Sequence, residues 1–347
     1  MSVTQAQLAR ELGLSQVAVS HALLGKPGVG ARTRQRVLDA ARRGGYRPSR
    51  SARGMVSGRT QLIDLWLGLK TGVSRTPPNL LQSMQFAAES AGMQVLLSFL
   101  HDRQLSDPNR LPTILREHAA DGVLINYTHL VPEPLLELLT RYAIPAVWVN
   151  NKREHDAVHP DDLQIGRLAA ERFLELGHRR LAMFEVTGGE HYSRIDRWDG
   201  FRITAEAAGL TPRRIEVPGG LGVPYRQDAT HDDRVDQLVA RLDTPDRPTA
   251  IFAYSLGEAL AVVAALGRLG LSTPQDVSLI AVADEPVSVL VPVPISTVVL
   301  PQDRIGAAAV EELVAKIDRP ADTRPAIALP AKYVESRSTA RPPSKSC

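Results

Sequence analysis

Side chains able to contact nucleic acid gather on one face of residues 16–23, which helical spacing predicts to be a short helix. Four small or apolar residues can face inward: Ala18, Val19, Ala22 and Leu23. The opposite face presents groups that can meet DNA: Gln16, Val17, Ser20 and His21. Amide, hydroxyl and imidazole groups hydrogen-bond to base edges or phosphates, and apolar groups contact thymine methyls. This face therefore predicts nucleic-acid recognition, provided that a neighbouring helix positions it.

The residues just before this segment supply such a helix. Leu8, Ala9 and Leu12 form its apolar face. Gly13 stands where the turn needs a left-handed backbone, and the Ser15 hydroxyl can cap the next helix. The pattern is that of a helix-turn-helix, whose second helix enters the DNA major groove. An ordinary helical hairpin is the alternative.

A third helix is expected over residues 31–43, where Gly44 and Gly45 end it. Residues 1–46 then form a small three-helix head with little hydrophobic reserve. Residues 47–60 read as a linker whose helix is too short to hold in water alone. We expect such a segment to become ordered on contact with a partner.

The charge of the chain is unevenly distributed. Residues 1–60 hold eleven of the 41 Lys and Arg but two of the 38 Asp and Glu, a net charge of +9, which leaves the remaining 287 residues at −6. A basic head on an acidic body is typical of a nucleic-acid-binding module attached to a second domain with another task. A basic disordered tail is the alternative, and the helical periodicity argues against it.

Composition bounds the compartment and excludes several kinds of site. The one cysteine, Cys347, allows neither a disulfide within the chain nor a cysteine-based zinc site. No apolar signal region and no stretch long enough for a membrane span is visible. We expect a cytoplasmic, nucleoid-associated protein with no cofactor, no metal and no membrane partner.

From residue 61 onward, short apolar strands alternate with amphipathic helices, which indicates parallel sheets covered by helices on both faces. Strands are expected over residues 62–67, 94–100, 122–127, 145–149, 180–185, 249–254 and 277–283. Helices are expected near residues 80–91, 134–141, 163–176, 197–208, 235–242, 256–269 and 304–317. So many units predict two Rossmann-like lobes with a ligand in the cleft between them.

The expected core spans residues 61–340. Its first lobe takes residues 61–160 and 292–320, and its second lobe takes residues 161–291 and 321–340. Residues 341–347 are expected to form a frayed tail.

The order of these features resembles the LacI/GalR (lactose-repressor) family of bacterial transcription regulators over nearly the whole chain. In the head, the matching stretches are Val3-Thr4, Leu8-Ala9, Gly13-Leu14-Ser15, Val19-Ser20, Thr33-Arg34, Val37-Leu38 and Ala40-Ala41. In the body, they are residues 176–182, Arg197-Trp-Asp-Gly-Phe201, Gly270, residues 274–278, residues 295–298, Pro301 and Gly306. The resemblance implies an α/β fold, with an N-terminal three-helix helix-turn-helix head and a two-lobed periplasmic-binding-protein-like core of two Rossmann-like parallel sheets.

The resemblance also implies roles for residues of the head. Three residues are expected to read bases: Gln16 can pair with adenine, Val17 can contact a thymine methyl, and His21 can donate to guanine. A phosphate contact is the alternative for His21. Phosphate contacts fall to Thr4, Ser15, Ser20, Arg32 and Thr33. In the linker, the minor groove would meet Arg50, Ala52 and Met55, with Met55 in place of the family's leucine wedge.

In the cleft, the resemblance makes Arg197 the main effector contact, through its rigid fork of donors. A salt bridge to Asp196 or Asp199 is the alternative. Further effector-contacting candidates are Asn150, Ser193, Tyr254 and Asp284, whereas Trp66 and Trp148 are expected in the core. The chain departs from the family at two places, with Tyr254-Ser255 for the usual Asn-Asp and Ala283 for the Asp that holds a pair of sugar hydroxyls. The effector is therefore expected to be a sugar or related metabolite of open identity; an unusual sugar, a nucleoside, a phosphorylated metabolite and the absence of any effector are the alternatives.

Two other readings are weaker. Residues 155–162 contain metal-ligand residue types without a known zinc spacing, so we expect a loop followed by a helix that Asp161 or Asp162 caps. An α/β metabolite-binding enzyme with a basic extension would need a catalytic constellation, and no Ser/His/Asp signature or nucleophile elbow is visible. The sequence predicts a transcription repressor that binds a double-stranded, pseudo-palindromic operator as a homodimer, or as a tetramer, under the control of a small effector.

Overall fold

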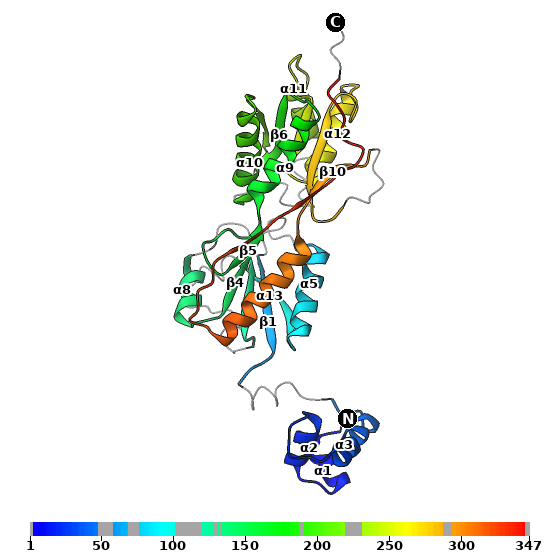
Figure 1. Ribbon diagram of the computed structural model, residues 1–347, viewed down its shortest axis with the longest axis vertical. Helices are drawn as coiled ribbons and strands as arrows, with labels where there is room; N and C mark the ends of the chain where they lie inside the picture. Colours follow the sequence, from blue (N-terminus) through cyan, green and yellow to red (C-terminus); the bar gives the residue numbers. More distant parts are fainter. Residues whose placement is uncertain are drawn as a thin grey trace. The chain divides into compact units, whose positions relative to one another are not determined.

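A computed structural model describes residues 3–47, 58–68, 76–100, 119–127, 131, 133–187, 191–218, 231–286 and 293–343. The chain divides into two compact units, Met1–Thr60 and Gln61–Cys347. Helices make up the described part of the first unit, and the second unit holds two sheets (Figure 1). Among the described residues, no helix has the length and apolar character needed to cross a membrane.

The first unit is built from α1 (Gln5–Leu12), α2 (Gln16–Leu23) and α3 (Ala31–Arg43). Gly13 ends α1 with a φ of 65°, the left-handed region that glycine adopts without a steric penalty. The Ser15 hydroxyl accepts from the Ala18 N–H at 3.1 Å and caps α2, which confirms the predicted turn. The apolar sides of the three helices meet in one small core that contains Leu8, Ala9, Val19, Ala22, Val37, Ala40 and Ala41.

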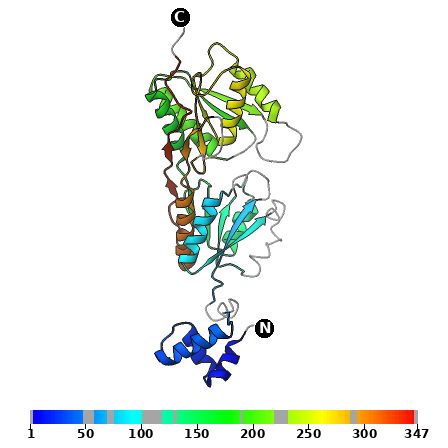
Figure 2. The ribbon, with the colours of Figure 1, turned by 90° about the vertical axis from the view of Figure 1, so that its right-hand side faces the viewer.

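The first sheet of the second unit is parallel throughout, in the order β11-β5-β4-β3-β1-β2. Its strands are β1 (Leu62–Gly68), β2 (Gln94–Leu100), β3 (Gly122–Asn126), β4 (Ala146–Val149), β5 (Ala157–Pro160) and β11 (Ile327–Leu329). On one face, α5 (Pro78–Ser90) and α13 (Gln302–Asp318) lie side by side (Figures 1 and 2). On the other face packs α8 (Glu133–Arg141).

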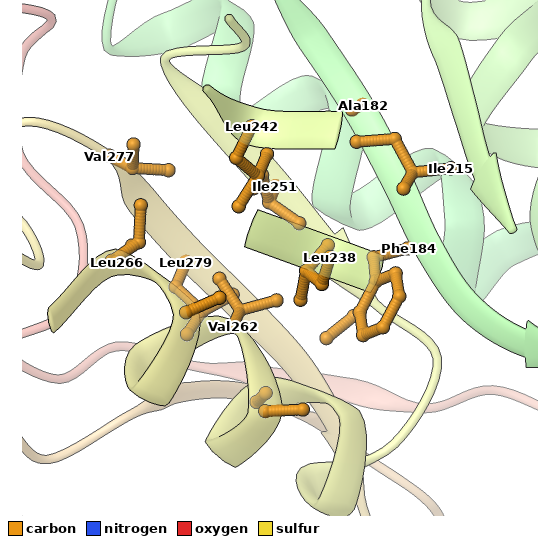
Figure 3. Packing of buried hydrophobic residues seen from close by; sticks show 14 of the residues in the cluster. Ala182, Phe184, Ile215, Leu238, Leu242, Ile251, Val262, Leu266, Val277 and Leu279 are labelled. Carbon is orange, nitrogen blue, oxygen red and sulfur yellow. The ribbon is translucent and has the colours of Figure 1, made fainter. Parts of the chain in front are cut away.

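The second sheet has the order β12-β10-β9-β8-β6-β7, and β12 alone among these strands runs antiparallel to its neighbour. Its strands are β6 (Leu181–Thr187), β7 (Arg213–Pro218), β8 (Ala250–Ala253), β9 (Ser278–Ala283), β10 (Ser296–Val299) and β12 (Lys332–Val334). One face is covered by α9 (Asp162–Glu175) and α10 (Ser193–Ala207). The other is covered by α11 (His231–Leu242) and α12 (Leu256–Arg268), whose Leu238, Val262 and Leu266 pack with Phe184 and Ile251 of the strands (Figure 3).

Two glycines allow α9 and α10 to cross at close range. A Cβ added to Gly166 would lie 2.0 Å from the carbonyl oxygen of Arg197, and one added to Gly200 would lie 2.0 Å from that of Leu163. Any side chain at either position would push the helices apart. The crossing places Asp162, in the first turn of α9, next to Arg197 of α10.

The structure corrects the predicted lobe boundaries. Residues 292–320 were assigned to the first lobe, but β10 pairs with β9 in the second sheet. Residues 321–340 were assigned to the second lobe, but β11 pairs with β5 in the first sheet. Strands of three or four residues carry too short an apolar pattern to reveal which sheet they join, because register and partner come from tertiary packing.

The sequence also failed to predict several other strands. Residues 157–160, expected as a loop, form the buried strand β5. The predicted helix cap beyond it is confirmed, since Asp161 accepts from the Gln164 N–H at 3.0 Å. β7, β10, β11 and β12 were likewise not predicted.

Candidate functional site

The outward face of α2 carries the predicted base-contacting side chains. Gln16 and Val17 are exposed in its first turn, and Val17 is 65% exposed although it is apolar. On the opposite face, Val19 and Ala22 are buried in the core of the head. Packing thus fixes the rotation of α2 and leaves Gln16 and Val17 free to meet a partner.

The third candidate, His21, is held by the loop that follows α2. Its Nδ1 lies 3.1 Å from the carbonyl oxygen of Pro27. Arg34 of α3 donates to the carbonyl of Lys26 at 2.7 Å, and the Lys26 N–H donates to the carbonyl of His21 at 3.0 Å. The loop is therefore anchored at both α2 and α3, and it sets the orientation of the imidazole.

Four of the five phosphate candidates lie at helix starts, and Ser20 lies within α2. Thr4 caps α1 in a reciprocal capping box with Gln7, and Ser15 caps α2. Arg32 and Thr33 are in the first turn of α3, and Ser20 is half-buried on α2. Helix N-termini attract anions, which suits contact with phosphate. The linker candidates lie outside the described residues: Arg50, Ala52 and Met55.

In the second unit, three of the predicted effector residues belong to one hydrogen-bonded chain. His191 Nε2 lies 2.9 Å from the carbonyl oxygen of Asn150, and His191 Nδ1 lies 2.7 Å from Ser193 Oγ. Ser193 Oγ lies 2.7 Å from the Tyr254 hydroxyl. Asn150 follows β4 of the first sheet, whereas Ser193 begins α10 and Tyr254 follows β8 of the second sheet, so these hydrogen bonds connect the two lobes.

The protonation states of these residues determine which group donates in each hydrogen bond. Burial lowers the pKa of His191, which favours the neutral ring. Because a carbonyl oxygen can only accept, Nε2 donates to Asn150 and Nδ1 accepts from the Ser193 hydroxyl. Ser193 Oγ then accepts from the Tyr254 hydroxyl, and burial raises the pKa of Tyr254, which keeps that hydroxyl protonated.

Arg197 is 6% exposed, and its guanidinium group hydrogen-bonds to two neighbours. Its Nε donates to Asp162 Oδ1 at 2.7 Å, and a terminal nitrogen donates to the carbonyl of Tyr254 at 3.0 Å. Burial lowers the pKa of Arg197, but the charge and hydrogen bond of Asp162, together with the nearby Tyr254 and Tyr192, outweigh burial, so the net shift of the pKa is upward. The predicted alternative partners, Asp196 and Asp199, are therefore wrong, since Asp196 pairs instead with Lys152 at 2.6 Å.

Ala283 is the last residue of β9, and Asp284 follows it. The Asp284 carbonyl accepts from Asn79 Nδ2 at 2.8 Å, and its Oδ1 accepts from Gln302 Nε2 at 2.7 Å. Asp284 thus hydrogen-bonds to the N-terminal turns of α5 and α13. Ala283 is 9% exposed and offers no acceptor in its side chain.

Sequence reasoning missed three residues of this site: His191, Tyr192 and the role of Asp162. Asp162 Oδ2 and the Tyr192 hydroxyl are buried close to each other, and neither makes a hydrogen bond of good geometry to a described residue. Burial raises the pKa of Tyr192 well above its ordinary value, with a further contribution from Asp162. The available signal was the run His191-Tyr192-Ser193 just before Arg197. Trp66 and Trp148 lie in the core as predicted, at 0% and 5% exposure.

A helix-turn-helix head attached to a two-sheet α/β body with a buried polar site defines a DNA-binding transcription regulator. Residues 170–339 match the model of the periplasmic binding protein-like domain family. The HTH-type transcriptional regulator AglR of Rhizobium meliloti (strain 1021) is 32% identical over 291 residues, which cover 81% of this chain and 78% of AglR. The ribose operon repressor of Escherichia coli (strain K12) is 26% identical, covering 91% of this chain and 94% of the repressor.

The fold is also similar to that of a solved repressor structure. The lac repressor dimer, bound to operator and the anti-inducer ONPF, superposes with a TM-score of 0.78 at 20% identity, covering 98% of this chain and 100% of that one. The chain belongs to the LacI family of transcription regulators, as its resemblance to that family predicted.

Proposed function

We propose that the protein is a repressor that binds a pseudo-palindromic operator as a homodimer, in the cytoplasm and at the nucleoid. Residues 1–46 bind DNA, residues 47–60 form the linker that joins the head to the core, and residues 61–340 bind a metabolite. Gln16, Val17 and His21 read bases, while Thr4, Ser15, Ser20, Arg32 and Thr33 hold phosphates. The minor-groove contacts are assigned to Arg50, Ala52 and Met55.

The observation that carries DNA binding is the free face of α2. Gln16 and Val17 are exposed on a helix whose rotation is fixed by the buried Val19 and Ala22. The surrounding head is basic, and contacts with phosphate release counterions. Specific binding of this kind should weaken steeply as salt rises.

The test is a selection of bound duplexes from a random library by the full-length protein, followed by titration of the enriched duplex. Wild type should enrich a two-part site, and Gln16→Ala should weaken binding to that site by about tenfold or more relative to random DNA. Gln35→Ala is the matched control, because Gln35 is exposed on α3 and donates to Asp39. Equal binding of selected and random duplexes would overturn the proposal.

The effector proposal rests on the polar groups beside Arg197. Asp162 Oδ2 and the Tyr192 hydroxyl are buried and lie near each other, yet neither makes a hydrogen bond of good geometry to a described residue, and a polyhydroxylated ligand could hydrogen-bond to both. Asn150, Ser193 and Tyr254 complete the site, and Asp284 is assigned to it by the resemblance to the family. The ligand is a sugar or related metabolite that binds the two lobe arrangements unequally and so changes operator affinity.

A thermal-shift screen of sugars, nucleosides and phosphorylated metabolites tests this part. A hit should raise the melting temperature of wild type, and it should do so less for Ser193→Ala and Tyr254→Phe. Tyr142→Phe is the matched control, because Tyr142 is 52% exposed on another element. A hit that shifts all four proteins equally binds elsewhere and would overturn the assignment.

A further inference from the structure

We infer that His21 reads DNA through an acceptor nitrogen and therefore selects a base that presents an amino group in the major groove, adenine or cytosine. The inference rests on the proposed docking of α2 in the major groove. This inference replaces the expectation that His21 donates to guanine, which the residue type alone suggested.

The hydrogen bond to Pro27 decides which ring nitrogen carries the proton. The carbonyl oxygen of Pro27 can only accept, so His21 Nδ1, at 3.1 Å, must be the donor. A neutral imidazole has one N–H, which leaves His21 Nε2 with a lone pair. Among the described residues, Nε2 makes no hydrogen bond, so that lone pair is available to a ligand.

The loop that supplies the carbonyl is fixed before DNA arrives. Lys26 is bonded to the carbonyl of His21 through its N–H and to the side chain of Arg34 through its carbonyl. Gly28 has a φ of 95°, and a Cβ added there would lie 3.8 Å from His21 Nδ1, so the turn closes against the ring. The donor side of the imidazole is thus occupied by the protein itself.

Base chemistry follows from the free acceptor. In the major groove, adenine presents its N6 amino group and cytosine its N4 amino group, and either can donate to Nε2. Guanine presents the acceptors N7 and O6, which would face the lone pair of Nε2 without a proton between them. One base pair per half-site should therefore exclude guanine on the strand that His21 faces.

The test is the duplex selection described above, with full-length protein at about pH 8. Wild type should enrich adenine or cytosine at one position of each half-site. His21→Ala should lose the preference at that position alone, and His21→Arg, a pure donor, should turn it to guanine. Gln35→Ala should reproduce the wild-type site.

Fixed duplexes then measure the effect. Placing guanine at the His21 position should weaken wild-type binding by roughly five- to tenfold, and His21→Arg should show the opposite order. Wild-type preference for guanine there, or an unchanged preference profile in His21→Ala, would overturn the inference while DNA binding stands. If His21→Ala does not bind at all, the wild-type and His21→Arg comparison decides. If wild type enriches no sequence, the proposed function itself fails.

Discussion

Arg197 and Asp162 stand 35 positions apart in the sequence, yet Arg197 Nε lies 2.7 Å from Asp162 Oδ1. They meet because Gly166 and Gly200 let α9 and α10 approach until backbone touches backbone. The pair is buried on both sides, so each charge depends on the other for its solvation.

Removal of one member of this pair should be costly. Arg197→Met should lower the free energy of unfolding by about 3–5 kcal/mol, because the Asp162 charge stays buried without its partner. Urea unfolding measures the loss. The double variant Arg197→Met/Asp162→Leu should be more stable than Arg197→Met, since it buries no charge.

The matched control for that experiment is Arg202→Met on the same helix. Arg202 pairs with Asp199 and Glu206 at the surface, where water screens the charges. Its loss should move the urea midpoint little. An equal loss for Arg197→Met and Arg202→Met would contradict a special role for the buried pair.

The helix crossing can be tested with glycines alone. Gly200→Ala should destabilise by about 1–3 kcal/mol, because the new methyl would meet the carbonyl oxygen of Leu163. Gly267→Ala on α12 should stabilise by up to about 1 kcal/mol, because nothing lies within 4 Å of its Cβ and alanine favours helix. Thermal melts of both variants measure the contrast, and equal shifts would rule out the close crossing.

Acid should weaken the second unit through His178. Its ring contacts Thr249 Oγ1 and the carbonyl of Ala340, and burial lowers its pKa below the ordinary 6.5. The unfolded chain then binds this proton more tightly than the folded chain does. The contribution of His178 to the free energy of unfolding is therefore fully present above pH 6.5 and is lost as the pH falls toward the lowered pKa.

Unfolding free energies measured between about pH 5 and pH 8 check this dependence. His178→Gln cannot titrate, so its stability should decline less with acid even if it is lower overall. A decline as steep as that of wild type would assign the acid sensitivity to other groups.

Ser15 separates helix capping from phosphate contact. Ser15→Ala should destabilise the head by about 1 kcal/mol, because the Ala18 N–H loses its acceptor. Ser15→Asp should retain the cap and the stability but weaken DNA binding, because it sets a carboxylate against the phosphate. Melting of the head and operator titration measure the two effects, and unchanged DNA affinity in Ser15→Asp would remove Ser15 from the phosphate contacts.

The sequence predicted those parts of the fold whose pattern is long or locally determined. The third helix was expected over residues 31–43 and is observed at Ala31–Arg43, and the strand at residues 94–100 is observed at Gln94–Leu100. Ser15 and Gly13 were also assigned correctly, because capping and left-handed turns depend on adjacent residues alone.

The sequence by itself determined that a basic helix-turn-helix head precedes a two-sheet α/β body. Periodicity shows which side of each element is buried, turn residues mark where elements end, and the charge distribution separates the head from the body. Tertiary structure alone decided that Arg197 pairs with Asp162, that β10 and β11 join opposite sheets, and that Pro27 fixes the proton of His21. Each of these depends on the approach of segments through a crossing, a sheet register or a loop closure, and such distances are set by packing in three dimensions rather than by neighbouring residue types.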